Sequence, residues 1–337
     1  MSLFYDDMME QPEALEQLLK NQKNIIKRAD VVFQNFEKSK LLLTGMGSSY
    51  HASEYAAVYL REHGMCAQVE ELSELLLYYS PELLKSYDKI IILSQSGETA
   101  ELKSFINKYP YLREKYVFVT NNKNSSSINF FEEKNVFLLE AGEEKALGST
   151  KSFINSVMLL LIIADHFFNK KTDFEKVLAE LNKALKSDMS AHENFLQENK
   201  EILIISRGYG VAISKMAKLT FAEISKLPCV VFSGAGFRHG PLELLYNNPN
   251  IIFIGMLGKS YKLIIKLYED IKDNANKLLI TNSSSFNNSI KVGGELPEFL
   301  SFLISIVVFQ NMAENIAKYR GFEAGKGFFA SKITEEE

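Results

Sequence analysis

The segment 94–99, with the sequence SQSGET, combines three hydroxyl side chains with a glycine directly after a short apolar run. If that run is a strand and a helix follows, the free backbone amides and the helix dipole favour an anion at this junction. The hydroxyls of Ser94, Ser96 and Thr99 can add charge-assisted hydrogen bonds of about 1.5–3 kcal/mol each. We therefore predict a phosphate-binding loop without a cation, while the alternative that the hydroxyls only cap the helix stays open.

Two other side chains have the chemistry of proton transfer. Glu223 closes a helical stretch, 216–224, whose other residues are largely apolar. Desolvation raises the pKa of a carboxyl group toward neutrality, where it can act as a general base. His239 lies in the glycine-rich segment SGAGFRHGP, and a neutral imidazole can pass a proton near pH 7. Without further context, Glu223 could equally be a surface residue of a long helix, and His239 a loop residue bonded to the backbone.

A second turn, GMGSS at 45–49, has glycines that allow close backbone approach and offers Ser49 as a further hydroxyl. The pattern GxxxxGK[ST] does not occur, so a P-loop is not indicated, and GxG followed by Tyr50 is an incomplete dinucleotide fingerprint. Because Glu70 could imitate the ribose-binding acid of that fingerprint, a dehydrogenase stays a minor alternative.

An internal repeat supplies the elements that position these residues. One shift of 161 residues superposes three apolar runs without a gap: 41–44 on 202–205, 90–93 on 251–254, and 117–121 on 278–282. Each run is short and often β-branched, and a polar or glycine turn and a segment of helical period follow it, as in parallel strands with crossover helices. The predicted fold class is α/β, with two tandem doubly wound parallel-sheet domains of the flavodoxin-like kind.

We expect a first domain at 1–170, with an N-terminal helix and the phosphate loop, and a second at 171–337, with a C-terminal tail. The linker is expected at 169–172, and a helix near 173–199 is expected to open the second domain. Ligands of open α/β sheets bind beyond the carboxyl ends of the strands. There the second copy reads GMLGKS, at 255–260, and has lost nearly all of the hydroxyl donors. Only the first copy should therefore hold the phosphate.

Composition narrows the class of partner. The chain has 337 residues, with 38 Lys and Arg against 42 Asp and Glu. Because it contains no basic run, we expect no nucleic acid and no membrane partner. Cys66 and Cys229 are far apart and have no CxxC spacing, so we expect no disulfide, no metal and no cofactor. The longest apolar runs are about half of the ~20 residues that span a bilayer, and the N-terminus does not resemble a signal peptide. These features predict a soluble, cytoplasmic protein that binds a small molecule.

The segments TGMGSSYHAS, ILSQSGETAEL, LGSTKSF, AEIS, GFRHGP and SKIT follow one another along nearly the whole chain. Together they resemble the two-lobed sugar isomerase (SIS) family, especially the isomerase domain of glucosamine-6-phosphate synthase and the fructosamine-6-phosphate deglycases. The resemblance implies that Glu223 moves a proton between C1 and C2, that His239 opens the sugar ring, and that Lys332 reaches the carbonyl end of the substrate. It also implies two sets of binding residues: Ser49, Ser94, Gln95, Ser96 and Thr99 for the sugar phosphate, and Leu147 and Ser149 lining the sugar site.

The chain starts almost directly with the sugar-binding half and has no cysteine near its start, so we expect no glutamine-driven synthesis from this chain alone. The residues and the resemblance together favour a fructosamine 6-phosphate deglycase that releases glucose 6-phosphate. The alternatives are a ketose/aldose phosphosugar isomerase, a glucosamine-6-phosphate deaminase and, from another class, a non-catalytic phosphosugar sensor. A homodimer is implied because relatives commonly build the site with a histidine loop from a neighbouring subunit. Lys151 and Arg238 are possible helpers whose ordinary role is surface charge.

Overall fold

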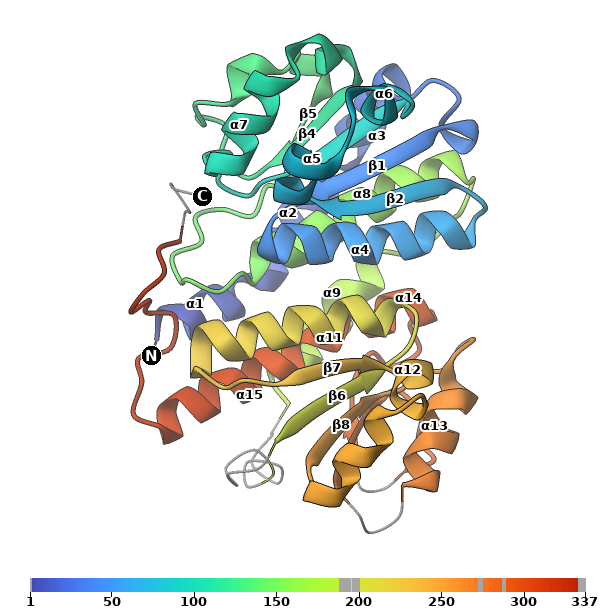
Figure 1. Ribbon diagram of the computed structural model, residues 1–337, viewed down its shortest axis with the longest axis vertical. Helices are drawn as coiled ribbons and strands as arrows, with labels where there is room; N and C mark the ends of the chain where they lie inside the picture. Colours follow the sequence, from blue (N-terminus) through green and yellow to red (C-terminus); the bar gives the residue numbers. More distant parts are fainter. Residues whose placement is uncertain (1, 188–194, 196–200, 272–274, 287–288, 333–337) are drawn as a thin grey trace. The chain divides into compact units, whose positions relative to one another are not determined.

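The computed structural model describes residues 2–187, 195, 201–271, 275–286 and 289–332. The chain forms two five-stranded sheets in which all strand pairs described are parallel (Figure 1). The first sheet has the order β2-β1-β3-β4-β5 and consists of β1 (Lys40–Gly45), β2 (Cys66–Glu71), β3 (Lys89–Leu93), β4 (Tyr116–Thr120) and β5 (Val136–Leu138). The second has the order β10-β9-β8-β6-β7 and consists of β6 (Ile202–Ser206), β7 (Val230–Ser233), β8 (Asn250–Ile254), β9 (Asn276–Thr281) and β10 (Ile290–Lys291).

Numbered within each sheet, both orders read 2-1-3-4-5, which is the flavodoxin-like doubly wound order. The predicted fold class is confirmed. The three runs superposed by the sequence repeat are the strand pairs β1 and β6, β3 and β8, and β4 and β9. The repeat therefore reflects two copies of one sheet topology.

Contacts between residues divide the chain into two compact units. The unit containing the first sheet comprises Glu13–Glu144, Ser149–Asp173 and Gly327–Glu337, and we call it the first-sheet unit. The second-sheet unit comprises Met1–Pro12, Lys145–Gly148 and Phe174–Lys326. A domain boundary at residue 170 stays a prediction. The two units differ from such a cut because the N-terminal end and residues 145–148 belong to the second-sheet unit, and the C-terminal end belongs to the first-sheet unit.

Helices cover both faces of the first sheet. Its strands are therefore apolar on both faces, as is usual for buried parallel strands. Leu42, Ile90 and Phe118 belong to a core cluster that includes residues of α5 and α7. The alternate residues, such as Ile91, line a small cavity with Leu60 and other residues of the opposite layer. The helices of this part of the chain are α2 (Gln11–Lys20), α3 (Gln22–Val32), α4 (Gly47–Glu62), α5 (Leu72–Tyr78), α6 (Pro81–Lys85), α7 (Ala100–Lys108) and α8 (Lys151–Phe167).

The second sheet is covered in the same way. Leu203 and Phe253 pack with Phe237 of α12 and Ile264 of α13 on one face. Helix α11 packs on β6 and also contacts α14 and α15. The helices of this part are α1 (Leu3–Met9), α9 (Glu175–Leu185), α11 (Tyr209–Thr220), α12 (Gly234–Arg238), α13 (Tyr261–Asp270), α14 (Glu298–Ile304) and α15 (Ile306–Tyr319). The expected linker, 169–172, forms neither helix nor strand. The expected helix at 173–199 is seen as α9, and most of its second half lies outside the described residues.

One helical segment, Glu298–Tyr319, is long and apolar enough by length and composition to cross a membrane, although its uninterrupted apolar runs are short, as the sequence predicted. Isolated polar residues such as Ser305 and Gln310 interrupt its apolar runs in the sequence. Both are buried, and Gln310 accepts a hydrogen bond of 2.9 Å from Gln11. The most apolar stretch of this segment is 83% buried inside the protein, so the segment is packed like a core helix.

The core beneath the predicted phosphate loop can be tested at Phe118. Its ring is fully buried in β4 and stacks on Phe131, with centroids 4.2 Å apart. We expect Phe118→Ala to lower the free energy of unfolding by about 3–5 kcal/mol, because the lost ring leaves a cavity. Urea denaturation measures the change. Leu77→Ala, at a side chain 68% exposed, serves as the control and should stay within about 0.5 kcal/mol; an equal loss in both variants would contradict this packing.

Candidate functional site

The predicted phosphate loop, 94–99, connects β3 to α7 at the carboxyl edge of the first sheet. β1 and β3 are neighbours in this sheet, with Thr44 paired to Ile92, and the strand order reverses between them. This is the switch point at which doubly wound folds bind ligands. The turn after β1 ends at the same edge and places Ser49, which is half-buried, in the first turn of α4. The structure thus brings the two predicted binding turns to one edge.

The loop donors are satisfied unequally. Ser94 and Ser96 are buried, and their hydroxyl oxygens accept from the amides of Gly97 and Glu98 at 3.2 Å each. Thr99 is the N-cap of α7 but makes no side-chain capping bond. The hydroxyl of Thr99 is therefore not consumed by capping, and an anion at this junction can receive it.

Residues after β4 fix the loop backbone. The carbonyl of Gln95 accepts from the Asn121 amide at 3.1 Å and from Thr120 Oγ1 at 3.2 Å. The Asn122 side chain donates to the carbonyl of Ser96 at 3.0 Å. With its carbonyl held in this way, Gln95 keeps a half-buried side chain at the loop. These bonds preorganise the loop before any ligand arrives.

Glu98 has a positioning role that the sequence did not reveal. Its carboxylate accepts from the Ser126 amide and hydroxyl and pairs with Lys103 Nζ at 2.8 Å. The bond from Lys103 and those from Ser126 together lower the pKa of Glu98 to about 2. Because the negative charge is directed to Ser126 and Lys103, it does not occupy the anion position. The sequence did contain one signal for this role, namely an acidic residue inside a loop that is predicted to bind an anion.

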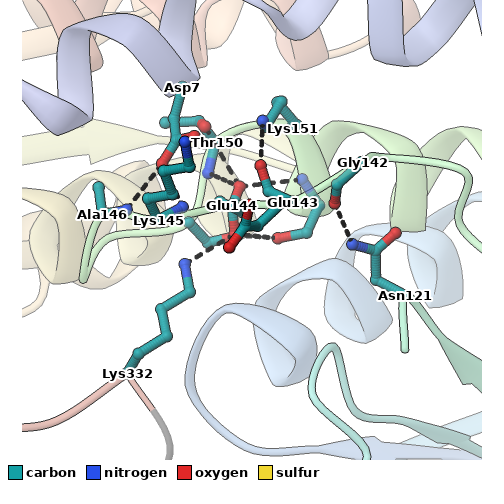
Figure 2. Close-up of polar contacts among 12 residues, drawn as sticks. Asp7, Asn121, Gly142, Glu143, Glu144, Lys145, Ala146, Thr150, Lys151 and Lys332 are labelled. Atoms are coloured by element: carbon teal, nitrogen blue, oxygen red, sulfur yellow. Dashed lines mark hydrogen bonds and ion pairs between the residues drawn. The ribbon is translucent and has the colours of Figure 1, made fainter. Parts of the chain in front are cut away.

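A second carboxylate, Glu144, lies fully buried in the first-sheet unit and was not predicted (Figure 2). It accepts from the Thr150 amide at 2.8 Å and from the Ser152 hydroxyl at 2.7 Å, and it pairs with Lys332 Nζ at 2.9 Å. Burial by itself would raise the pKa of Glu144, but the Lys332 ammonium and the hydrogen bonds from Ser152 and Thr150 outweigh it and hold the pKa below its ordinary value. Lys332 therefore reaches the buried carboxylate of Glu144, which precedes LGS in the chain and accepts from the Thr150 amide that follows it.

The segment around LGSTKSF is held at several points. In the second-sheet unit, the buried carboxylate of Asp7 accepts from the amides of Lys145 and Ala146 at 2.8 and 2.7 Å (Figure 2). Leu147 is half-buried, and its amide donates to the carbonyl of Gly325 at 2.9 Å. In the first-sheet unit, Ser149 is buried with its hydroxyl 2.6 Å from that of Ser152.

Lys151 and Arg238 are both engaged by the protein. Lys151 is only 2% exposed and donates to the carbonyl of Glu143 at 2.6 Å, so the expectation of surface charge is wrong for this residue. The sequence could not show this, because the buried position depends on the turn before α8. Arg238 is exposed and pairs with Asp270, as expected of a surface charge.

Glu223 lies in a π-helical turn, Phe221–Ser225, that continues α11. Such turns are rare and occur frequently at functional sites. Glu223 is half-buried between the fully buried Phe221 and Ile224. In the same unit, Gly148 packs so closely on Ile224 that an added Cβ would lie 2.8 Å from its Cδ1. The structure thus brings the turn that carries Glu223 against the segment that carries Leu147.

His239 is exposed and forms the C-cap of α12. Among the residues that the structure describes, its ring makes no hydrogen bond or ion pair, with Glu223 or with any other side chain. The interior of this unit therefore does not position the predicted ring-opening residue.

A hollow of about 990 Å³ lies away from the predicted phosphate ligands, against α3 and β5, where Arg28 and Val136 are part of its lining. None of the predicted site residues lines it. In the described part of the chain, no group of three or more His, Cys, Asp or Glu side chains is placed to hold a metal ion.

The close packing of the loop can be tested at Gly97, which has φ +67° and lies where an added Cβ would be 2.6 Å from the Cβ of Ser125. We expect Gly97→Ala to weaken the binding of inorganic phosphate at least tenfold in calorimetric titration. Gly142→Ala is the matched control, because Gly142 has φ +65° but no atom within 4 Å of its Cβ position. Similar affinities for the two variants would contradict a binding role for the loop.

The ion pair between Glu144 and Lys332 predicts that the stability of the protein depends on pH. Because the pKa of Glu144 is held below its ordinary value of 4.5, its stabilising effect is complete above that value and is lost as the pH falls through the folded-state pKa. Lys332→Met should lower the free energy of unfolding at pH 7 by about 1–3 kcal/mol, since Lys332 is only partly buried. It should also move the acid limb of the stability curve to higher pH.

Denaturation at a series of pH values measures both effects. Lys326→Met is the control, because Lys326 and its partner Glu323 are more than half exposed and 3.6 Å apart. An acid limb that does not move in Lys332→Met would show that the pair does not stabilise the protein.

The SIS domain family model matches residues 36–164 and 195–287, one match on each sheet. Glutamine–fructose-6-phosphate aminotransferase [isomerizing] of Thermococcus kodakarensis is 25% identical over 341 residues, which cover 95% of this chain and 56% of that protein. The chain thus spans about half the length of the curated relatives it matches.

Two solved structures share the fold. The C-terminal domain of glucosamine-fructose-6-phosphate aminotransferase from Francisella tularensis has a TM-score of 0.79 at 19% identity, covering 97% of this chain and 98% of that one. Tagatose-6-phosphate ketose/aldose isomerase from Escherichia coli has a TM-score of 0.81 at 16% identity, covering 96% and 94%. With the family model matched on both sheets, the chain belongs to the SIS domain family.

Proposed function

We propose that this chain is an enzyme that binds a hexose phosphate on the loop 94–99 and moves a proton between C1 and C2 of the sugar through Glu223. The observation that carries the proposal is the loop itself. It lies at the switch point of the first sheet, its backbone is fixed, and the Thr99 hydroxyl is not spent on capping. Donors preorganised in this way match a phosphate monoester.

Phosphate binding is assigned to the first-sheet unit. The hydroxyls of Ser94, Ser96 and Thr99 can donate to the phosphate oxygens, and the dipole of α7 adds a favourable field. The proposed ligands are completed by two half-buried residues of the same edge: Ser49 and Gln95. Since no cation is required, recognition rests on neutral donors that hold their positions.

Proton transfer is assigned to Glu223. Abstraction of a proton bound to carbon needs a base that is partly shielded from water, and Glu223 is half-buried in a π-helical turn. The Lys226 ammonium lies close enough to interact with this carboxylate, and its Nζ donates to the carbonyl of Glu223. Both contacts help to fix the turn that presents the base.

The proposed substrate is a 6-phosphofructosyl amine, with the amine on C1 and the carbonyl on C2. After His239 assists ring opening, Glu223 takes a proton from C1, the C2 oxygen is protonated, and an enaminol forms. Return of the proton to C2 gives an imine between C1 and nitrogen. Water adds to that imine, and the carbon–nitrogen bond breaks to release the amine and glucose 6-phosphate. Leu147 and Ser149 line the sugar in this proposal.

Lys332 is proposed to act as a cation near the carbonyl end of the substrate. Its Nζ is engaged by Glu144 at 2.9 Å, so it could attack a carbonyl only after leaving that partner. Electrostatic stabilisation of developing negative charge keeps the pair intact and is the role we prefer.

A homodimer in the cytoplasm completes the proposal. His239 is exposed at the end of α12, which suits a histidine that serves the site of a neighbouring copy. Cys66 and Cys229 are both free thiols, as is usual in a reducing compartment.

A coupled assay for glucose 6-phosphate across a panel of 6-phosphofructosyl amines tests the function. We expect turnover with at least one amine, and a loss of kcat/KM of about 10²–10⁴-fold in Glu223→Gln with substrate affinity retained. Glu243→Gln, at an exposed glutamate of the same unit, is the matched control and should keep full activity. Full turnover in Glu223→Gln would exclude it as the base.

The same panel separates the alternatives. Conversion of ketose to aldose phosphate without any amine would support an isomerase, and release of ammonia from glucosamine 6-phosphate a deaminase. Tight binding of hexose 6-phosphates with no conversion would support a sensor.

A further inference from the structure

The second-sheet unit contains a counterpart of the phosphate loop. The segment 255–260 connects β8 to α13, just as 94–99 connects β3 to α7. The shift of 161 residues that relates the strands places Gly258 on Gly97 and Ser260 on Thr99. The glycine and the hydroxyl N-cap are thus present in both loops, although the other hydroxyls are not.

A carboxylate of the chain occupies this second loop. Glu298 Oε2 accepts from the amide of Lys259 at 3.0 Å. Glu298 Oε1 accepts from the amide of Ser260 at 3.4 Å and from its hydroxyl at 3.2 Å. A Cβ added at Gly258 would lie only 2.7 Å from the Cβ of Glu298, so the side chain lies directly on the loop backbone. Two amides and a hydroxyl, the donors expected of an anion site, therefore converge on one internal carboxylate.

The first-sheet unit lacks such an internal anion. Its amides at Gly97 and Glu98 donate to serine hydroxyls, and among the described residues no carboxylate accepts from the amides of 97–99. The helix that follows the fifth strand begins with Lys151 in this unit, whereas the helix that follows the fifth strand of the second sheet begins with Glu298. The charge at this helix start is thus opposite in the two units.

We propose that Glu298 is an internal substitute for a phosphate group, which fills the anion site of the second sheet and restricts sugar-phosphate binding to the first. This inference rests on the proposed function for the identity of the first site. A second anion would meet both the bulk and the negative charge of the carboxylate at 255–260. Removal of Glu298 would leave three convergent donors for an external phosphate.

Calorimetric titration of the full chain with inorganic phosphate tests the proposal, with chloride at equal ionic strength as the reference. We expect one phosphate per chain in the unaltered protein and two in Glu298→Ala. Glu295→Ala, at an exposed glutamate of the same segment, is the matched control and should stay at one. A single site in Glu298→Ala would overturn the proposal.

A second background separates this inference from the proposed function. Ser96→Ala combined with Thr99→Val should abolish phosphate binding, and adding Glu298→Ala should restore one site. If the unaltered chain bound no phosphate, the proposed function would fail, while the gain of a site on removal of Glu298 would still decide the present inference.

A smaller change covers the case in which Glu298→Ala does not fold. Glu298→Gln is neutral and of the same size, so it weakens the internal ligand without emptying the loop. In the background with both loop substitutions, phosphate should raise the melting temperature of Glu298→Gln and not that of its parent. Equal responses of the two proteins would count against the proposal.

Discussion

Backbone amides at the start of a helix have no partner within the helix, and in this protein carboxylates repeatedly supply one. Asp7 does the same for two loop amides that precede α8, those of Lys145 and Ala146. Glu144 takes the amide of Thr150 at the start of α8, and Glu298 takes those before α13. The loop before α7 is the contrasting case, because its own serines satisfy only part of its donors. The proposed phosphate completes the pattern with an anion from outside the chain.

The cost of these arrangements is highest at Glu144, whose side chain is entirely buried. A carboxylate is tolerated there because hydroxyls, amides and the Lys332 ammonium all point toward it. The same carboxylate accepts from Ser152, which lies beside Ser149. Order in the predicted sugar-lining segment and order in the C-terminal tail thus depend on one group. The ion pair with Glu144 helps to fix the position of Lys332.

In our proposal, the two sheets use one topology for two purposes. Both have the same strand order and the same loop–helix junction after the third strand. The difference lies in a few side chains: hydroxyls at Ser94 and Ser96 in one loop, against Gly255 and Leu257 in the other, with Glu298 added. The two loops therefore differ in their side chains without a change in strand order, as is expected when function resides in sites carried by a stable fold.

The sequence by itself determined three strands of each sheet, the constant shift that relates them, and the place of the loop that we predict to bind phosphate. Short apolar runs at a constant shift encode buried parallel strands, and SQSGET follows one of them, so local pattern and topology agree. It also identified Glu223 within an apolar helical stretch. The π-helical form of that turn was not visible, because it depends on tertiary packing rather than on local propensity.

Only the tertiary structure decided which charges face one another. Glu144 and Lys332 are 188 residues apart, and Glu298 lies 39 residues from Lys259. No local pattern joins partners over such distances, and a lone carboxylate in a sequence has the same appearance whether it is solvated or buried. Lys151 was misjudged for this reason: the burial of a charge follows from the surroundings that the fold assembles around it.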